Sequence, residues 1–324
     1  MSIFKRVIRK TKKPLTIVSV LMVMLVVLLS YFLLSTDAPL LQGKIAYQIP
    51  YNQDQMLDVY FPTAKHDGPH PVVLFIHGGA WITGTKEAVN FNRFNEAINN
   101  LRERGYIIVS PNYTLARNGK SPFPKCIYDI YDAIEWIKSN AKAYDFDLDN
   151  IGLFGESAGA HIAMMIAFSK PGNFEQSNHT TKFSYLIDVY GPNDLYDLYH
   201  MKTMDSLKSL LSRLPPKLNQ KLDISQYLFG FNPNKDTAKA SSFMQKYSPL
   251  SYLHSSIPPT LIIHGKQDIL VPVSQSENLH QLLDSLNIEN KIYLLKGVDH
   301  AFRGASDAQK DSVQSWITSF IINH

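Results

Sequence analysis

The sequence predicts an α/β fold in which a mostly parallel sheet is covered by helices on both faces. Short β-branched apolar runs alternate along the chain with helical segments, which is the pattern of such folds. The run at 72–77 (VVLFIH) is continuously apolar, as expected for a strand buried on both faces of a sheet. With 45% hydrophobic and 19% charged residues, the composition is that of a globular chain and excludes a disordered or collagen-like one.

The expected strands and helices follow from local hydrophobic periodicity, and turn residues mark several of their ends. Strands are expected at 44–49, 57–61, 72–77, 107–110, 151–154, 183–190, 260–264 and 291–294, the first two as a hairpin. Helices are expected at 90–104, 125–143, 158–169, 273–286 and 305–322. Together these elements predict one domain that spans 42–324.

Residues 192–250 interrupt the alternation, because they contain no buried strand. An insert of this length in a compact domain is usually functional, so a lid or cap is expected here. It contains apolar, helix-like pieces at 207–214 and 227–231. The alternative interpretation is a structural cap that has no role in binding.

The N-terminal segment has the pattern of a membrane anchor. Residues 15–34 are 20 uncharged, mostly apolar residues, and a helix of this length spans about 30 Å, the thickness of a bilayer core. We expect a basic cytoplasmic tail at 1–14, a transmembrane signal anchor at 15–35 and an extracytoplasmic domain, by the positive-inside rule. The alternative is secretion after signal cleavage, although the apolar run exceeds the usual 7–15 residues and Thr36-Asp37-Ala38 matches a cleavage site poorly. A buried core helix is a third, weaker alternative, because the run is apolar all round.

The charge distribution argues against a nucleic-acid partner. The formal net charge of +4 becomes −2 without six basic residues of the N-terminal tail, namely Lys5, Arg6, Arg9, Lys10, Lys12 and Lys13. No basic stripe with interleaved aromatic residues follows. The single cysteine, Cys126, allows no intrachain disulfide and has no metal-type Cys/His spacing around it, so we expect a buried core residue and no metal.

The pattern Gly155-Glu156-Ser157-Ala158-Gly159 predicts a nucleophilic serine. It fits G-x-S-x-G and lies between an expected strand and an expected helix, which is the context that this motif requires. The turn is tight, so the flanking positions must be small. The serine hydroxyl then stands clear at the end of the sheet, and the N–H groups of the following helix point towards the same place.

A serine nucleophile needs a base and an orienting acid, which follow it in the order acid, then histidine. Asp268 follows the strand expected at 260–264, and His300 follows the strand expected at 291–294, so both should lie at the same sheet edge as Ser157. Each has a less specific alternative, a solvated loop acid and a surface histidine. Asp299 adjoins His300, but adjacent residues rarely point at each other.

Three other histidines are expected to have structural roles. His264 ends an apolar strand and should be packed. His161 lies one turn past Ser157 and should pack beneath the turn, and His77 precedes a glycine pair.

Attack on a carbonyl also requires donors for the developing oxyanion. We expect the backbone N–H of Ala158 to be one donor, and those of Gly78 and Gly79, in His77-Gly78-Gly79-Ala80-Trp81, to be the others. Glycine suits these positions because the backbone must approach the substrate closely. The alternative interpretation is a plain turn at the end of a strand.

From about Gln42 onwards the chain resembles the hormone-sensitive-lipase-like branch of the α/β-hydrolases and the related BD-FAE-like carboxylesterases. Five stretches match in order: HGGAW at 77–81, NYTLA at 112–116, FPKCIYDIYDAIEWI at 123–137, GESAG at 155–159, and HGKQDILVP at 264–272 followed by DHAF at 299–302. The resemblance implies Ser157 as nucleophile, Asp268 as acid and His300 as base. It also implies Gly78, Gly79 and Ala158 as oxyanion donors.

The sequence departs from the family pattern at two positions. Ala80 replaces the third glycine that many relatives carry, which makes bulky tertiary-alcohol esters doubtful substrates. Glu156 replaces the commoner aspartate before the nucleophile. The subgroup includes acetyl- and feruloyl-type esterases, arylformamidases and a membrane-bound prenylcysteine methylesterase, and the motifs do not separate these.

The expected function is hydrolysis of carboxylic esters, with a short acyl group, through an acyl-enzyme on Ser157. The expected partner is a small-molecule ester, and neither an organic cofactor nor a metal is expected. Trp81, Phe302 and the insert at 192–250 are expected to line the pocket. The alternatives are an amidase, arylformamidase or peptidase that uses the same residues, and a non-catalytic binding protein on a hydrolase scaffold.

Overall fold

An eight-stranded sheet forms the centre of the computed structural model, which describes residues 43–90, 93–174, 181–201 and 224–324. The strand order is β1-β2-β4-β3-β5-β6-β7-β8. Strand β2 runs antiparallel to β1 and β4, and every other neighbouring pair is parallel. The strands are β1 (Ile45–Pro50), β2 (Met56–Tyr60), β3 (His70–Ile76), β4 (Ile107–Pro111), β5 (Phe146–Glu156), β6 (Leu186–Val189), β7 (Thr260–Gly265) and β8 (Asn290–Leu295).

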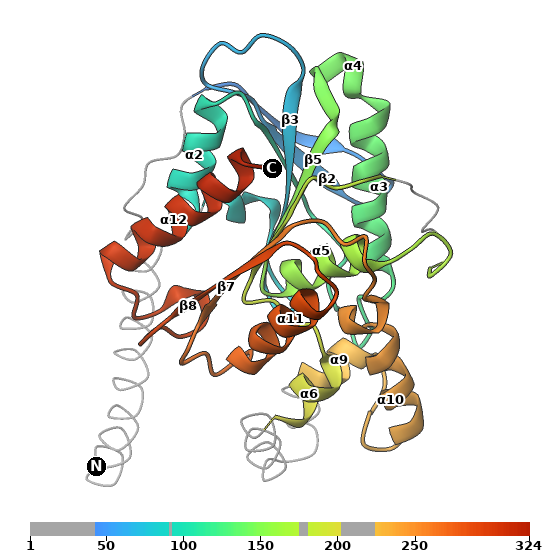
Figure 1. Cartoon of the computed structure of the whole chain (residues 1–324). Coiled ribbons are helices and arrows are strands. Elements are labelled where there is room, and N and C mark those ends of the chain that lie inside the picture. Colours follow the sequence, from blue (N-terminus) through green and yellow to red (C-terminus); the bar gives the residue numbers. More distant parts are fainter. Residues whose placement is uncertain (1–42, 91–92, 175–180, 202–223) are drawn as a thin grey trace, which may run out of the picture. The chain divides into compact units, whose positions relative to one another are not determined.

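Helices cover both faces of the sheet, as predicted (Figure 1). Helices α2 (Asn95–Glu103) and α12 (Asp307–Ile322) pack on one face. The opposite face is covered by α3 (Lys125–Ser139), α5 (Ala158–Phe168) and α11 (Val273–Ser285). The continuous apolar run of β3 is explained by burial on both faces of the sheet. Val72, Leu74 and Ile76 belong to the hydrophobic cluster on one face, and Val73 and Phe75 belong to the cluster on the other.

Several element boundaries differ from those expected. The helix expected at 125–143 ends at Ser139, where Asn140 caps it through a side-chain hydrogen bond to the Trp136 carbonyl, and a short helix α4 (Ala141–Tyr144) follows. The helix expected at 90–104 begins only at Asn95, after the 3-10 turn η1 (Lys86–Asn90). These differences leave the strand order and the two-faced cover unchanged.

The insert expected at 192–250 is helical where it is described. It contains α6 (Leu195–His200), α9 (Ile224–Phe229), α10 (Thr237–Lys246) and the 3-10 turn η2 (Pro249–Tyr252), and no strand occurs in its described parts. Figure 1 shows α6, α9 and α10 gathered at one end of the sheet, beyond α5 and α11. The helical piece expected at 207–214 lies outside the described residues.

The expected cytoplasmic tail at 1–14 and transmembrane anchor at 15–35 also lie outside the described residues. Within the ranges that the structure does describe, no helix is both long and apolar enough to cross a membrane.

Candidate active site

Ser157 occupies a strained turn between β5 and α5, as the sequence predicts. Its backbone angles are φ +54° and ψ −119°, a region that non-glycine residues rarely adopt. A Cβ on Gly155 would lie 2.3 Å from Ala160 Cα, and one on Gly159 would lie 2.0 Å from the Ile76 carbonyl oxygen. Both neighbours of this turn must therefore be glycine, which gives the motif a direct steric reason.

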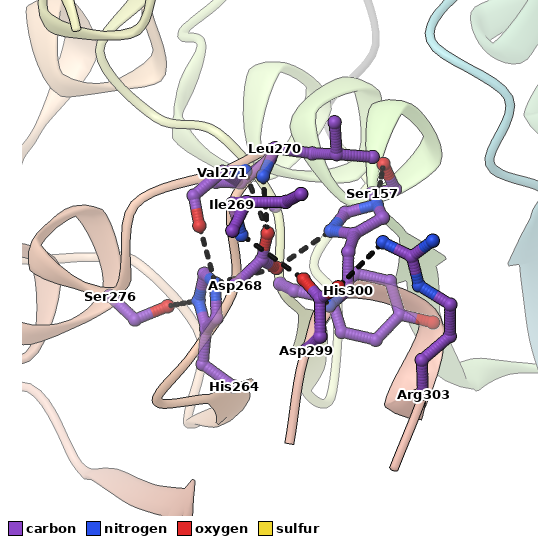
Figure 2. A network of polar contacts seen from close by, with 12 residues as sticks. Ser157, His264, Asp268, Ile269, Leu270, Val271, Ser276, Asp299, His300 and Arg303 are labelled. Carbon is purple, nitrogen blue, oxygen red and sulfur yellow. Dashed lines mark hydrogen bonds and ion pairs between the residues drawn. The ribbon is translucent and has the colours of Figure 1, made fainter. Parts of the chain in front are cut away.

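The structure brings Ser157, His300 and Asp268 into one hydrogen-bonded line (Figure 2). Ser157 Oγ lies 3.1 Å from His300 Nε2, and His300 Nδ1 lies 2.7 Å from Asp268 Oδ2. Asp268 follows β7, and His300 follows β8 in the 3-10 turn η3 (His300–Phe302), so both come from the expected loops. The Asp268 side chain is fully buried and that of His300 is 12% exposed.

Asp268 is held as a carboxylate. Burial alone would raise its pKa, but hydrogen bonds from His264 and His300 outweigh burial and hold the pKa well below its ordinary range. The backbone N–H groups of Leu270 and Val271 donate to Oδ1, each at 2.8 Å. Because an ionised carboxylate only accepts, we assign the hydrogen to His300 Nδ1, which leaves the Nε2 lone pair facing Ser157. This arrangement can remove a proton from the serine hydroxyl.

Asp299 joins the two loops that carry Asp268 and His300. Its Oδ1 accepts from the backbone N–H of Ile269 at 3.1 Å and of His300 at 2.7 Å. Its Oδ2 forms an ion pair with Arg303 at 2.6 Å. His300 Nδ1 contacts Asp268 and not Asp299, and the sequence argument missed the connection that Asp299 makes.

Two of the predicted oxyanion-donor residues, Gly78 and Ala158, adjoin Ser157. A Cβ on Gly78 would lie 3.3 Å from Ser157 Cβ, so the loop after β3 lies against the predicted nucleophile. Gly79 has φ +125°, and a Cβ there would lie 2.0 Å from the Thr83 carbonyl oxygen. Among the described residues, neither glycine's backbone N–H has a hydrogen-bond acceptor. Ala158 is the first residue of α5, where backbone N–H groups have no partner within the helix.

Trp81 and Phe302, which were expected to line the pocket, are both buried. Trp81 is 5% exposed and packs against Phe123 and His161. Phe302 is 6% exposed and packs against Tyr190 in the core of the other sheet face. Position near a strand end places an aromatic side chain close to the site but leaves open which way it points, and here both point into the core.

Glu156 forms a buried network behind the nucleophile. Its Oε1 accepts from the Tyr190 hydroxyl at 2.7 Å and forms an ion pair with Arg93 at 2.7 Å. The Tyr190 ring centroid lies 4.6 Å from that of His300, so the network reaches the predicted base. The partners stand 34 and 63 positions away from Glu156, and no local signal in the sequence could have identified them.

Cys126, His77, His161 and His264 are all buried, as expected for residues with structural roles. Cys126 is fully buried in the core, and burial raises the pKa of its thiol. Burial lowers the pKa of His77 and of His161 to about 4, so both are neutral packed residues at physiological pH. His264 is packed as expected but also contacts Asp268, which the sequence analysis missed. The described residues contain no group of three His, Cys, Asp or Glu side chains that could hold a metal ion.

One protein family and several named ester hydrolases are similar to this chain. The BD-FAE family model matches residues 57–283. The "Probable carboxylic ester hydrolase LipM" of Mycobacterium tuberculosis is 28% identical over 80% of this chain and 56% of its own length. The "Isoprenylcysteine alpha-carbonyl methylesterase ICME" of Arabidopsis thaliana is 27% identical over 81% of this chain and 58% of its own length. The chain thus spans somewhat more than half the length of these relatives.

Solved structures show the same fold. The inhibited esterase B from Lactobacillus rhamnosis has a TM-score of 0.67 at 18% identity, over 95% of this chain and 96% of that chain. An arylesterase structure has a TM-score of 0.64 at 21% identity, over 89% of this chain and 88% of that chain. The strand order, the turn at Ser157 and the family match over more than half of the chain agree. The chain is therefore an α/β-hydrolase that belongs to the BD-FAE family.

Proposed function

We propose that this protein hydrolyses carboxylic esters of small molecules through an acyl-enzyme on Ser157. The observation that carries the proposal is the hydrogen-bonded line from Ser157 through His300 to the buried, ionised Asp268. Membership of the BD-FAE family and similarity to proteins named as ester hydrolases support it.

The chemistry follows from the positions of these groups. Ser157 Oγ attacks the acyl carbon while His300 Nε2 takes its proton, and Asp268 stabilises the imidazolium that forms. The backbone N–H groups of Gly78, Gly79 and Ala158 stabilise the negative oxygen. His300 then gives the proton to the departing alcohol, which leaves an acyl-serine. Water, deprotonated by His300, attacks the acyl carbon, and the carbonyl–Oγ bond breaks to release the acid and regenerate Ser157.

The choice between ester and amide substrates is tested with the full-length protein. A panel would pair nitrophenyl acetate, butyrate and octanoate with formylkynurenine and aminoacyl amides, and kcat/KM would be measured for each. We expect the short-chain esters to have the highest kcat/KM. Faster turnover of the amides would replace esterase with the amidase alternative.

The loop at Gly78 offers a test of the oxyanion donors. Gly78→Ala would place a Cβ 3.0 Å from the Glu156 carbonyl oxygen and 3.3 Å from Ser157 Cβ, so the loop and the turn at Ser157 must separate by a few tenths of an ångström. We expect kcat for ester hydrolysis to fall about tenfold, because a small displacement misaligns the N–H donors with the developing oxyanion. Gly119→Ala is the control for backbone strain without a steric contact, because φ is +70° there and its Cβ would meet nothing within 4 Å. Equal kcat values for the two variants would argue against Gly78 as part of the oxyanion site.

We further propose that residues 15–35 anchor the protein in a membrane, with its catalytic domain on the extracytoplasmic side. The uncharged apolar run at 15–34 and the six basic residues before it support this topology. Protease added to intact cells or spheroplasts should then remove the domain. Full protection of the domain, with digestion only after lysis, would exclude this topology, and release of the domain into the medium would indicate cleavage.

A further inference from the structure

We infer that His264 is a positioning residue for ester hydrolysis: it holds the Asp268 carboxylate in the orientation that His300 requires. The inference rests on the proposed function. It arises from a feature that the reaction does not use, a second histidine on the same carboxylate oxygen. His264 Nε2 lies 3.1 Å from Asp268 Oδ2, and His300 Nδ1 lies 2.7 Å from the same atom (Figure 2).

The contacts of His264 make its Nε2 a donor. This nitrogen faces two acceptors, Asp268 Oδ2 and the Val271 carbonyl oxygen, the latter at 3.0 Å. Neither a carboxylate nor a carbonyl can donate, so the hydrogen must be on the ring nitrogen. The other ring nitrogen, Nδ1, lies 2.7 Å from Ser276 Oγ. Ser276 on α11 therefore fixes the rotation of the ring, and the ring fixes the carboxylate.

Burial of His264 and Asp268 makes the loss of their hydrogen bond costly. The side chains of His264 and Asp268 are both fully buried, and Ser276 is buried as well. Water cannot readily replace a lost donor at such a position, and an unpaired carboxylate oxygen there is costly. The backbone donors of Leu270 and Val271 hold only Oδ1, so His264 is the group besides His300 that holds Oδ2. Without it, the position of Oδ2 depends on His300 and on the loop donors to Oδ1 alone.

The location of His264 in the fold also explains why it can do this. It lies in β7, and Asp268 follows on the loop directly after that strand. The strand is buried and hydrogen-bonded to β6 and β8 on its two sides, whereas the loop carries two exposed apolar side chains, Ile269 and Leu270. The hydrogen bond from His264 on the strand to Asp268 on the loop thus fixes the position of the carboxylate relative to the sheet.

The test compares substitutions in the full-length protein. His264→Leu removes the donor, whereas His264→Gln retains an amide N–H at about the position of Nε2. We expect His264→Leu to lower kcat and the rate of Ser157 labelling by a fluorophosphonate by about 10- to 100-fold, with KM little changed, because the acid is misplaced and not lost. We expect His264→Gln to restore kcat and the labelling rate to within a few-fold of the unsubstituted protein. His280→Leu is a control that removes another histidine four residues before an aspartate, on the outer side of α11.

A second pair of variants keeps the test decisive if His264→Leu does not fold. Ser276→Ala removes the partner of His264 Nδ1, and Ser274→Ala makes the same change at an exposed position of the same helix. We expect slower labelling for Ser276→Ala than for Ser274→Ala. A folded His264→Leu protein that labels at the unsubstituted rate would overturn the inference, as would equal rates for the two serine variants. Failure of the unsubstituted protein to label at Ser157 would instead refute the proposed function.

Discussion

Ser157→Ala is expected to lower kcat for ester hydrolysis by about 10⁶-fold, because it removes the only group that can form the acyl-enzyme. The remaining residues act on the serine oxygen and not independently, so they cannot replace it. The measurement is hydrolysis of nitrophenyl acetate by the full-length protein, with Ser274→Ala as the control, since Ser274 is an exposed serine on α11. Circular dichroism and thermal unfolding would establish that Ser157→Ala is folded. A folded variant that keeps more than about a hundredth of the activity would contradict the assignment of Ser157.

Asp268→Asn is expected to lower kcat by about 10⁴-fold while leaving the shape of the site intact. The carboxylate accepts from His300 Nδ1 at 2.7 Å, but an amide can present its NH2 group there instead. His300 would then carry its hydrogen on Nε2, facing Ser157, and could not take the serine proton. Stopped-flow measurement of acyl-enzyme formation would show this directly. A loss of less than about tenfold would mean that another group orients His300.

The same substitution should also affect stability, and in a pH-dependent way. The pKa of Asp268 is lowered in the folded protein, so its ionised form stabilises the fold above the ordinary aspartate pKa of about 4. That contribution is lost progressively as the pH falls from about 4 towards the lowered pKa of the folded protein. The free energy of unfolding should therefore differ most between the unsubstituted protein and Asp268→Asn at neutral pH, and the difference should shrink at acid pH. Urea unfolding at pH 7 and at about pH 2 measures it, and a difference that is independent of pH would contradict the stated cause.

The part of the candidate site that lies in loops after parallel strands could be predicted from the sequence. Parallel strands bring the residues that follow them to one edge of a sheet, so the positions of Ser157, Asp268 and His300 directly after β5, β7 and β8 were enough to bring them together. The glycines at 155 and 159 added a steric requirement that is local to the turn. The alternation of strands and helices also predicted a mostly parallel sheet covered on both faces, but the strand order came only from the structure.

The rest of the site depends on which way side chains point, and this is set by residues that are distant in the sequence. Trp81 and Phe302 turn into opposite hydrophobic cores because their packing partners, Phe123 and Tyr190, belong to other elements. The connection of Glu156 to Arg93 and Tyr190 likewise spans three separate segments. These contacts arise only once the sheet is assembled, so no periodicity or motif could indicate them.

The contact of His264 with Asp268 also could not be predicted, although the two residues are only four positions apart. Its position at the end of an apolar strand correctly predicted burial. Its contact with Asp268, however, depends on how the chain turns after β7 and on the hydrogen bond to Ser276 from α11. A histidine four residues before the predicted acid was the available signal in the sequence, and it was consistent with packing alone.

The most direct test of the central claim is covalent modification of Ser157 by a fluorophosphonate, followed by peptide mass spectrometry of the full-length protein. The reagent reacts only with a serine that a neighbouring base activates, so it reports the arrangement of Ser157, His300 and Asp268 without assuming a substrate. We predict a single adduct on the peptide that contains Ser157, with no adduct in Ser157→Ala and slow formation in Asp268→Asn. No adduct on the unsubstituted protein, or an equal adduct on Ser157→Ala, would contradict the assignment of Ser157 as the nucleophile.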